Sequence, residues 1–274
     1  MNRDFNGQVA LITGGAQGFG AAIARRLGAL GVKVVIADIN EELGKVVADE
    51  VGGIFIACDV TDYTDNQRAV ACAVENFGGL DMVLLNAGVV SALRMGENFD
   101  EVRYRKVMGI NLDGVVFGFN AALPALRQRG GGDVIATASM AGLMPVPFDP
   151  VYAANKAAVV GLTRSLGEAH AHENVRVNAV CPAFADTAIV DDIREGLAQA
   201  GVPLLTVEEV VDVFMQILES RQNAQCWFVQ PGRASEPFEF RRAPGPRTDQ
   251  GEKAPAVDAE TQLRIADSLA DPKD

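Results

Sequence analysis

The chain has 274 residues, of which 49% are hydrophobic and 22% charged, a composition typical of a globular domain with a substantial core. Its formal net charge of −12 argues against a nucleic-acid or anionic-membrane surface, which would need clustered positive charge. The longest apolar runs are far shorter than the about 20 residues needed to span a bilayer, and Met1 to Phe5 lack the apolar core of a signal peptide. We therefore expect a cytoplasmic protein without a membrane or nucleic-acid partner.

Short apolar strands alternate with helices over residues 1–232, which we expect to form one domain. Strands that are apolar throughout are typical of a parallel sheet buried on both faces. The predicted fold is therefore α/β, a single doubly wound Rossmann-type domain of about seven parallel strands with helices on both faces. The strands are expected at residues 8–13, 32–37, 53–58, 80–85, 134–138, 175–180 and 226–229. The helices are expected at residues 18–30, 41–51, 65–77, 99–128 (interrupted near Gly109 and Gly114), 151–171 and 207–220.

Residues 233–274 form a C-terminal extension of different character. The extension is rich in proline and charge and shows no strand pattern, and residues 259–269 predict one short amphipathic helix. Its composition is equally compatible with a flexible tail and with a segment docked on a neighbouring subunit or over a pocket.

The cysteines and histidines do not show the spacing of a metal site. No C-x-x-C pair occurs in the sequence, and no histidine lies close to a thiol. We therefore expect no metal site and no Cys–His nucleophile. The thiols are expected to be reduced and buried as small apolar groups; they belong to Cys58, Cys72, Cys181 and Cys226.

A glycine-rich turn joins the first strand to the first helix. Its glycines are spaced G-x-x-x-G-x-G, after a buried strand and before an amphipathic helix. Glycines at such a turn permit a pyrophosphate to approach backbone N–H groups at the helix N-terminus. The turn therefore predicts a dinucleotide site, formed by Gly14, Gln17, Gly18, Phe19 and Gly20.

Asp38 ends the second strand, eighteen residues beyond Gly20. A carboxylate there can accept hydrogen bonds from ribose hydroxyls and repels a 2′-phosphate. No basic residue follows it, since its neighbours are Ile39 and Asn40. This pattern predicts NAD rather than NADP, although a solvated Asp at a strand end is the simpler alternative.

Polar residues also follow the third and fourth strands. Asp59 and Val60 would lie at the adenine edge, and Asn86, Ala87 and Gly88 follow the fourth strand. Open α/β sheets bind ligands at these carboxyl ends. Within the long helical region, Asn111 is either a satisfied core amide or part of a proton path, and the sequence leaves both open.

Ser139, Tyr152 and Lys156 form the candidate catalytic set. Tyr152 and Lys156 are four residues apart on a predicted helix, so they share one face. A fixed ammonium favours the phenolate and lowers the pKa of a tyrosine, which makes it a general acid–base near neutral pH. Ser139 ends the fifth strand and could hydrogen-bond the same substrate oxygen.

Together these motifs resemble the short-chain dehydrogenase/reductase family over about residues 7–232. Within that family, residues 141–146, 150–152, 161–165 and 186–189 are similar to the NAD-dependent 15-hydroxyprostaglandin dehydrogenases. The resemblance implies the fold, an NAD cofactor and a hydride-transfer reaction.

The same resemblance assigns roles to individual residues. It implies that Tyr152 is the acid–base, that Lys156 lowers its pKa and holds the nicotinamide ribose, and that Ser139 orients the substrate oxygen. Asn111 would hold a water that links Lys156 to solvent. The cofactor-binding residues implied near the nicotinamide are Pro182, Phe184 and Thr187, with Thr187 contacting the carboxamide.

The candidate substrate pocket is mostly apolar. It comprises Met144, Val146, Phe148, Asp149 and Ile189, and residues 185–202 are the expected lid. The prostaglandin enzymes carry a glutamine pair where this chain has Phe148 and Asp149. A carboxylate at that place would disfavour a carboxylated substrate such as a prostaglandin. The lining predicts a neutral secondary alcohol or ketone on an apolar body.

We therefore expect an NAD-dependent oxidoreductase that transfers a hydride between a secondary alcohol or ketone and the nicotinamide. One alternative is a β-ketoacyl thioester reductase, disfavoured by Asp38 and by the lack of a basic patch for an acyl carrier. Another is a non-catalytic dinucleotide sensor, disfavoured because Tyr152 and Lys156 are both present. The resemblance also implies a homodimer or homotetramer, formed through the helices in residues 99–128 and 151–171.

Overall fold

The computed structural model describes residues 3–241, 244–255, 257, 261–262, 264–265 and 268. The chain divides into two compact units, Met1–Phe238 and Glu239–Asp274. The first unit extends beyond residue 232 because β8 (Glu236–Pro237) joins the sheet, so the expectation of no strand there is wrong. The short helix expected at residues 259–269 lies partly outside the described residues, and those of its residues that are described are helical.

The sheet has eight strands in the order β3-β2-β1-β4-β5-β6-β7-β8. All neighbouring strands are parallel except β7 and β8, which are antiparallel. The predicted doubly wound α/β fold is confirmed, with an antiparallel edge strand in addition. The parallel strands are β1 (Val9–Thr13), β2 (Lys33–Asp38), β3 (Ile54–Ala57), β4 (Met82–Leu85), β5 (Gly132–Thr137), β6 (Val175–Pro182) and β7 (Cys226–Val229).

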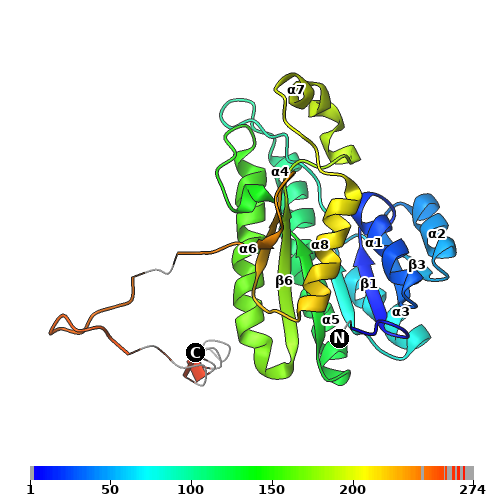
Figure 1. Cartoon of the computed structure of the whole chain (residues 1–274), viewed down its shortest axis with the longest axis horizontal. Coiled ribbons are helices and arrows are strands. Elements are labelled where there is room, and N and C mark those ends of the chain that lie inside the picture. Colours follow the sequence, from blue (N-terminus) through cyan, green and yellow to red (C-terminus); the bar gives the residue numbers. More distant parts are fainter. Residues whose placement is uncertain are drawn as a thin grey trace. The chain divides into compact units, whose positions relative to one another are not determined.

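Helices cover both faces of this sheet (Figure 1). On one face α1 packs against α2 and α8, and on the other α3 packs against α5, with α6 beside β6. Because β1 lies between β2 and β4, the order of the strands reverses there, and the carboxyl ends of β1 and β4 border the crevice that such sheets use for ligands. These helices are α1 (Gly18–Ala29), α2 (Glu41–Glu50), α3 (Tyr63–Phe77), α5 (Gly114–Gln128), α6 (Pro150–His170) and α8 (Val207–Ser220).

One cluster of the core lies between the sheet and the pair α1 and α8. Helix α8 begins with a capping box, in which Thr206 Oγ1 accepts from the N–H of Glu209 and the Glu209 carboxylate accepts from the N–H of Thr206. Its apolar face buries Phe214 and Ile217, which belong to the same cluster as Leu27 of α1. Each such side chain contributes about 1.5–3 kcal/mol through burial.

The long helical region is continuous rather than interrupted. Helix α4 (Glu101–Met108) leads through a π-helical turn, Gly109–Asp113, into α5. A Cβ at Gly114 would come 2.8 Å from Val60 Cγ2, so this glycine permits close packing and does not end the helix. The 28-residue helix is apolar enough to cross a membrane by length and composition, but α5 packs against α3, β4 and β5 as a core helix.

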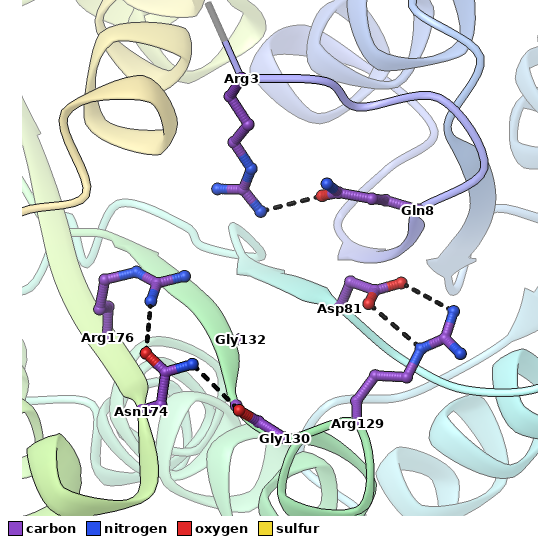
Figure 2. Close-up of a pocket in the computed structure, with 9 residues that line it drawn as sticks. Arg3, Gln8, Asp81, Arg129, Gly130, Gly132, Asn174 and Arg176 are labelled. Atoms are coloured by element: carbon purple, nitrogen blue, oxygen red, sulfur yellow. Dashed lines mark hydrogen bonds and ion pairs between the residues drawn. The ribbon is translucent and has the colours of Figure 1, made fainter. Parts of the chain in front are cut away.

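A polar pocket of about 140 Å³ opens at the amino ends of the strands, opposite the crevice (Figure 2). Its arginines are paired with carboxylates, since Arg129 donates to both oxygens of Asp81. The residues around this pocket therefore link segments of the chain to one another. Each arginine in its lining is paired with a carboxylate and offers no free charge to a ligand. Its lining residues are Arg3, Gln8, Asp81, Arg129, Gly130, Gly131, Gly132, Asn174 and Arg176.

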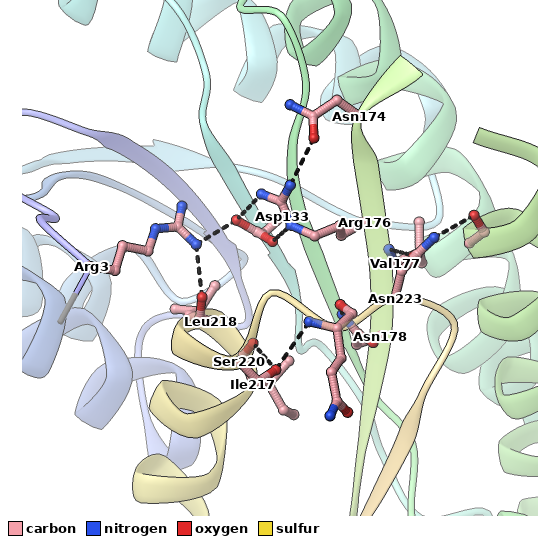
Figure 3. Close-up of polar contacts among 12 residues, drawn as sticks. Arg3, Asp133, Asn174, Arg176, Val177, Asn178, Ile217, Leu218, Ser220 and Asn223 are labelled. Carbon is pink, nitrogen blue, oxygen red and sulfur yellow. Dashed lines mark hydrogen bonds and ion pairs between the residues drawn. The ribbon is translucent and has the colours of Figure 1, made fainter. Parts of the chain in front are cut away.

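Asp133 anchors this end of the domain (Figure 3). Its side chain is 3% exposed and accepts from Arg3 Nη1 at 2.6 Å and Arg176 Nε at 2.7 Å. Arg3 also donates to the carbonyl of Leu218 at 3.0 Å. One buried carboxylate therefore ties the N-terminal segment to β5, β6 and the end of α8.

We predict that Asp133→Ala lowers the free energy of unfolding by about 3–5 kcal/mol, because two largely buried arginines would lose their carboxylate partner. Urea denaturation would measure the loss. Glu50→Ala is the control, since Glu50 pairs with Arg25 at the exposed surface and its removal should cost at most about 1 kcal/mol. Equal losses in the two variants would contradict the assignment.

Candidate active site

The turn between β1 and α1 is packed too closely for most side chains. Gly14 has φ +63°, and a Cβ there would lie 2.9 Å from Cα of Ala87, which follows β4. Gly20 packs directly on the carbonyl of Gly14. Gly18 differs, because its missing Cβ faces open space with only Thr187 Cγ2 at 3.9 Å. The turn thus leaves a cradle between the start of α1 and Thr187.

The N-terminus of α1 suits an anion. Gln17, its N-cap, and Gly18 are exposed, and no side chain caps the helix. Phe19 instead packs against the core. Uncapped N–H groups at a helix N-terminus carry partial positive charge, so this cradle fits the pyrophosphate of a dinucleotide.

Asp38 is held at the end of β2 by the backbone. Its Oδ2 accepts from the N–H of Ala16 at 3.0 Å and its Oδ1 accepts from the N–H of Asn40 at 2.9 Å. Beside it, Ile39 is 76% exposed, an apolar surface that a base could cover. A carboxylate fixed here fits an unphosphorylated ribose, because it would repel a 2′-phosphate.

Two of the other predicted cofactor residues use their side chains within the protein. Asn86 donates to the carbonyls of Thr13 and Gly14 and accepts from the hydroxyl of Thr137, so it links β1, β4 and β5. Asp59 accepts from the N–H and hydroxyl of Thr61. Val60 is buried against α5. Asn86 and Val60 therefore shape the site, whereas Asp59 is exposed and its side chain remains accessible to a ligand.

Ser139 and Tyr152 come together as the sequence predicts. Ser139 caps the short 3₁₀ turn Met140–Gly142 after β5, accepting from the N–H of Ala141. It also donates to the carbonyl of Pro182 and hydrogen-bonds the side chain of Tyr152. Tyr152 lies in the first turn of α6. Two hydroxyl groups thus meet beside the crevice.

Lys156 is buried beneath this pair and is 3% exposed. Its Nζ donates to the carbonyl of Thr137 at 2.7 Å and lies 5.7 Å from the centroid of the Tyr152 ring. A Cβ at Gly88 would lie 3.4 Å from Lys156 Nζ and from Asn111 Oδ1. The lack of a side chain at Gly88 therefore lets the side chains of Lys156 and Asn111 both lie close to its backbone.

Burial shifts the pKa values of both Tyr152 and Lys156. Burial raises the pKa of Tyr152 to about 12, although its hydrogen bond with Ser139 acts in the opposite direction. Burial also lowers the pKa of Lys156 to about 8. Lys156 is not among the groups that set the pKa of Tyr152 in this structure, where its ammonium bonds the Thr137 carbonyl, so the lowering of that pKa by Lys156 stays a prediction. The protonated phenol, a proton donor, is the favoured form.

Asn111 lies in the π-helical turn and is fully buried. Its Oδ1 accepts from the N–H of Val89 and its Nδ2 donates to the carbonyl of Val89, both at 2.8 Å. It is therefore a satisfied core amide that holds the segment after β4 to the helix. Its role in a proton path stays a prediction.

Asp149 does not face a substrate, which corrects the prediction made for it. It is the N-cap of α6, is 7% exposed, and both of its oxygens accept hydrogen bonds. The donors are the N–H groups of Tyr152, Ser91 and Ala92 and the Ser91 hydroxyl. Its charge is consequently no argument against a carboxylated substrate. The sequence carried no signal for the role of Ser91.

Exposed apolar side chains gather on the loops that follow β5 and β6. Met144, Phe148 and Ile189 are 53%, 69% and 44% exposed, and Val146 is half-buried. The rings of Phe148 and Phe184 stack at 6.3 Å, which joins the two loops. Residues 185–202 carry the 3₁₀ turn Ala188–Ile193 and α7 (Arg194–Gln199). Met144, Val146, Phe148 and Ile189 form the apolar mouth of the candidate site, which fits an apolar ligand.

Comparison with known proteins agrees with this geometry. A model of the short chain dehydrogenase family matches residues 8–198. The chain belongs to the short-chain dehydrogenase family.

Individual relatives extend the comparison. The chain is 38% identical over 215 residues to a 2,5-dichloro-2,5-cyclohexadiene-1,4-diol dehydrogenase of Sphingobium indicum, covering 76% of this chain and 86% of the relative. It is 39% identical over 202 residues to human NAD⁺ 15-hydroxyprostaglandin dehydrogenase, covering 69% and 73%. The crystal structure of the Brucella melitensis 3-ketoacyl-(acyl-carrier-protein) reductase complexed with NADH superposes with a TM-score of 0.77 at 27% identity, covering 84% and 99%.

The buried lysine of this short-chain dehydrogenase predicts a pH-dependent stability. The folded pKa of Lys156 is about 8 against an ordinary 10.5, so burial of its charge costs most below about pH 8. That cost fades as pH rises toward the pKa of the unfolded chain. Lys156→Met carries no such charge, so the wild type should gain about 2 kcal/mol relative to it between about pH 7 and pH 9.5. Urea denaturation at both pH values measures the difference, and a constant difference would contradict the prediction.

Proposed function

We propose that this short-chain dehydrogenase is an NAD-dependent oxidoreductase that transfers a hydride between a secondary alcohol or ketone on an apolar body and the nicotinamide. The observation that carries the proposal is the convergence of Ser139, Tyr152 and Lys156 beside a glycine cradle and a ribose-selecting Asp38.

The chain's residues divide the work of binding and proton transfer. Asp38 holds the adenosine ribose, and the cradle at Gly18 receives the pyrophosphate. Thr187, across that cradle, is placed to hold the nicotinamide end. The nicotinamide, when bound, supplies the hydride acceptor or donor. Ser139 orients the substrate oxygen, and Tyr152 gives or takes the proton at that oxygen.

The pKa of Tyr152 makes the rate of each direction of the reaction depend on pH. With a pKa raised to about 12, the phenol holds its proton at neutral pH and donates it to a ketone. Alcohol oxidation needs the deprotonated form, so it gains as pH rises.

The substrate class follows from the mouth of the site. Met144, Phe148 and Ile189 present exposed apolar surface, and the carboxylate of Asp149 is turned away from it. A chlorinated cyclohexadienediol and a hydroxyprostaglandin, named for two relatives, are both secondary alcohols on largely apolar carbon frames. The same class is the best match for this chain, with carboxylated members included.

A β-ketoacyl thioester reductase is the second candidate. The similarity to the Brucella 3-ketoacyl-(acyl-carrier-protein) reductase favours it. The net charge of −12 opposes it, because an acidic acyl carrier would need a basic docking patch. A non-catalytic dinucleotide sensor is opposed by the intact Ser139, Tyr152 and Lys156 set.

Tyr152→Phe tests the catalytic assignment. The variant removes only the hydroxyl group, so it should bind NADH as the wild type does while turnover with secondary alcohols falls by at least about 100-fold. Calorimetry with NADH and NADPH, followed by a panel of cyclic alcohols, their ketones and β-ketoacyl thioesters, measures both properties.

Each competing assignment gives a different result in this experiment. Full activity of Tyr152→Phe would contradict the assignment of the acid–base. Equal affinity for NADPH would contradict the role of Asp38. Turnover confined to thioesters would favour the second candidate, and NADH binding without turnover of any substrate would favour a sensor.

We also propose that the enzyme is a cytoplasmic homodimer or homotetramer and that the C-terminal extension beyond β8, residues 239–274, docks on a neighbouring subunit or over the site. The support is the exposed apolar surface on the long helix, where Val102 and Val116 are 82% and 39% exposed. Deleting residues 239–274, the second compact unit, should lower the number of subunits in the assembly, measured by light scattering, or change KM. Unchanged mass and kinetics would contradict the docking.

A further inference from the structure

The segment that follows β4 has an uncommon backbone conformation at Ala92. Its φ is +47°, in the left-handed region that residues with a Cβ rarely adopt. Such a residue persists where its surroundings hold it, and it is often found at functional sites. Here the N–H of Ala92 donates to Asp149 Oδ2 at 3.1 Å. The constraint on this segment therefore comes from the residue that begins the catalytic helix.

Asp149 joins three parts of the site through its two oxygens. Oδ1 accepts from the hydroxyl of Ser91 and from the N–H of Tyr152 at 3.1 Å. Oδ2 accepts from the N–H groups of Ser91 and Ala92 at 3.2 and 3.1 Å. The carbonyl of Ser91 in turn accepts from Arg103 Nε of α4. The first turn of α6, the segment after β4 and α4 are thus connected through one buried carboxylate.

Asp149 accepts four hydrogen bonds, so this position needs a side chain with two accepting oxygens. A carboxylate with both oxygens hydrogen-bonded is compensated in a site where it is 7% exposed. An asparagine could keep Oδ1 for the Tyr152 N–H, but its NH₂ group would then face the N–H groups of Ser91 and Ala92. Substitution by Asn should therefore retain the helix cap and release the segment after β4.

We propose that Asp149 is a positioning residue for the reaction: it locks the segment 89–93 to the start of α6 and so holds Tyr152 against the substrate oxygen. This proposal rests on the function proposed above. The segment begins at Val89, whose backbone is held by Asn111, so both of its ends are fixed to helices that line the site. Placement of the acid–base within a fraction of an ångström strongly affects rate.

The negative charge of Asp149 also affects the pKa of Tyr152. It acts with burial to raise the pKa of the phenol. The other groups near Tyr152 are Lys156 on its own helix, the neutral hydroxyl of Ser139 after β5, and Cys181 on β6, which lies beyond Lys156. Removing the charge of Asp149 should lower the pKa of Tyr152, and alcohol oxidation, which needs the phenolate, should then begin at lower pH.

The test compares Asp149→Asn and Ser91→Ala with the wild type. Asp149→Asn should reduce kcat for alcohol oxidation by about 10-fold or more. It should leave the Kd of NADH within about twofold. The pH at which the rate of alcohol oxidation begins to rise, the rising limb of the pH profile, should be lower than in the wild type. Ser91→Ala loses the two hydrogen bonds of the Ser91 hydroxyl, to Asp149 and from the N–H of Leu93, but keeps the charge of Asp149, so kcat should fall while the rising limb of the pH profile stays in place. Asp62→Asn is the matched control, because Asp62 caps α3 through the N–H of Thr64 and no catalytic residue lies on that helix.

A second readout does not depend on turnover. The absorbance of tyrosinate near 295 nm, taken as the difference between each protein and its Tyr152→Phe counterpart, gives the pKa of Tyr152 directly. That pKa should be lower in Asp149→Asn than in the wild type or in Asp62→Asn.

The outcomes separate the two proposals. If the wild type oxidises alcohols and Asp149→Asn matches it in kcat and in pH profile, the positioning role is overturned. The role is also overturned if kcat falls but the pH limb and the Tyr152 pKa stay unchanged, because Asp149 is then only a helix cap. If no alcohol or ketone is turned over but the Tyr152 pKa still falls in Asp149→Asn, the coupling stands and the proposed function fails.

Discussion

The buried ammonium of Lys156 is the constraint on which the rest of the site depends. An unpaired charge in the interior is costly, so the structure places the Thr137 carbonyl 2.7 Å from Nζ and the face of the Tyr152 ring beside it. Gly88 and Gly142 lack side chains where a Cβ would press on this lysine and its backbone. Burial lowers the pKa of Lys156 and raises that of Tyr152, so the packing of these two side chains also sets their protonation.

The amino and carboxyl ends of the parallel strands carry different kinds of side chain. At the amino ends, Asp133 joins Arg3 and Arg176 in a closed network of ion pairs that ties the N-terminal segment to the core. At the carboxyl ends, the loops keep apolar side chains exposed, including Met144 and Phe148. Parallel strands make this division possible, because all their carboxyl ends lie at one edge. The buried ion pairs thus lie at the amino ends of the strands, and the exposed apolar side chains lie at the carboxyl ends.

Much of the site could be predicted because its residues belong to short local patterns. The glycines of the first turn, Asp38 at a strand end, and Tyr152 four residues before Lys156 each report a local geometry that holds wherever the pattern occurs. The strands were predicted to within a few residues for the same reason, since burial on both faces makes them apolar throughout. Membership of the short-chain dehydrogenase family follows from the joint occurrence of these patterns.

What the sequence alone determined about this protein is therefore its fold class and family, and it predicted the residues of a dinucleotide site and a catalytic set, all carried by neighbours along the chain. Tertiary structure decided the environment of each group. Whether Asp149 faces a substrate or Ser91 depends on a contact across 58 positions, and the pKa of Tyr152 depends on burial by several elements. Desolvation and long-range hydrogen bonds arise only when distant segments meet, so no local pattern could have reported them.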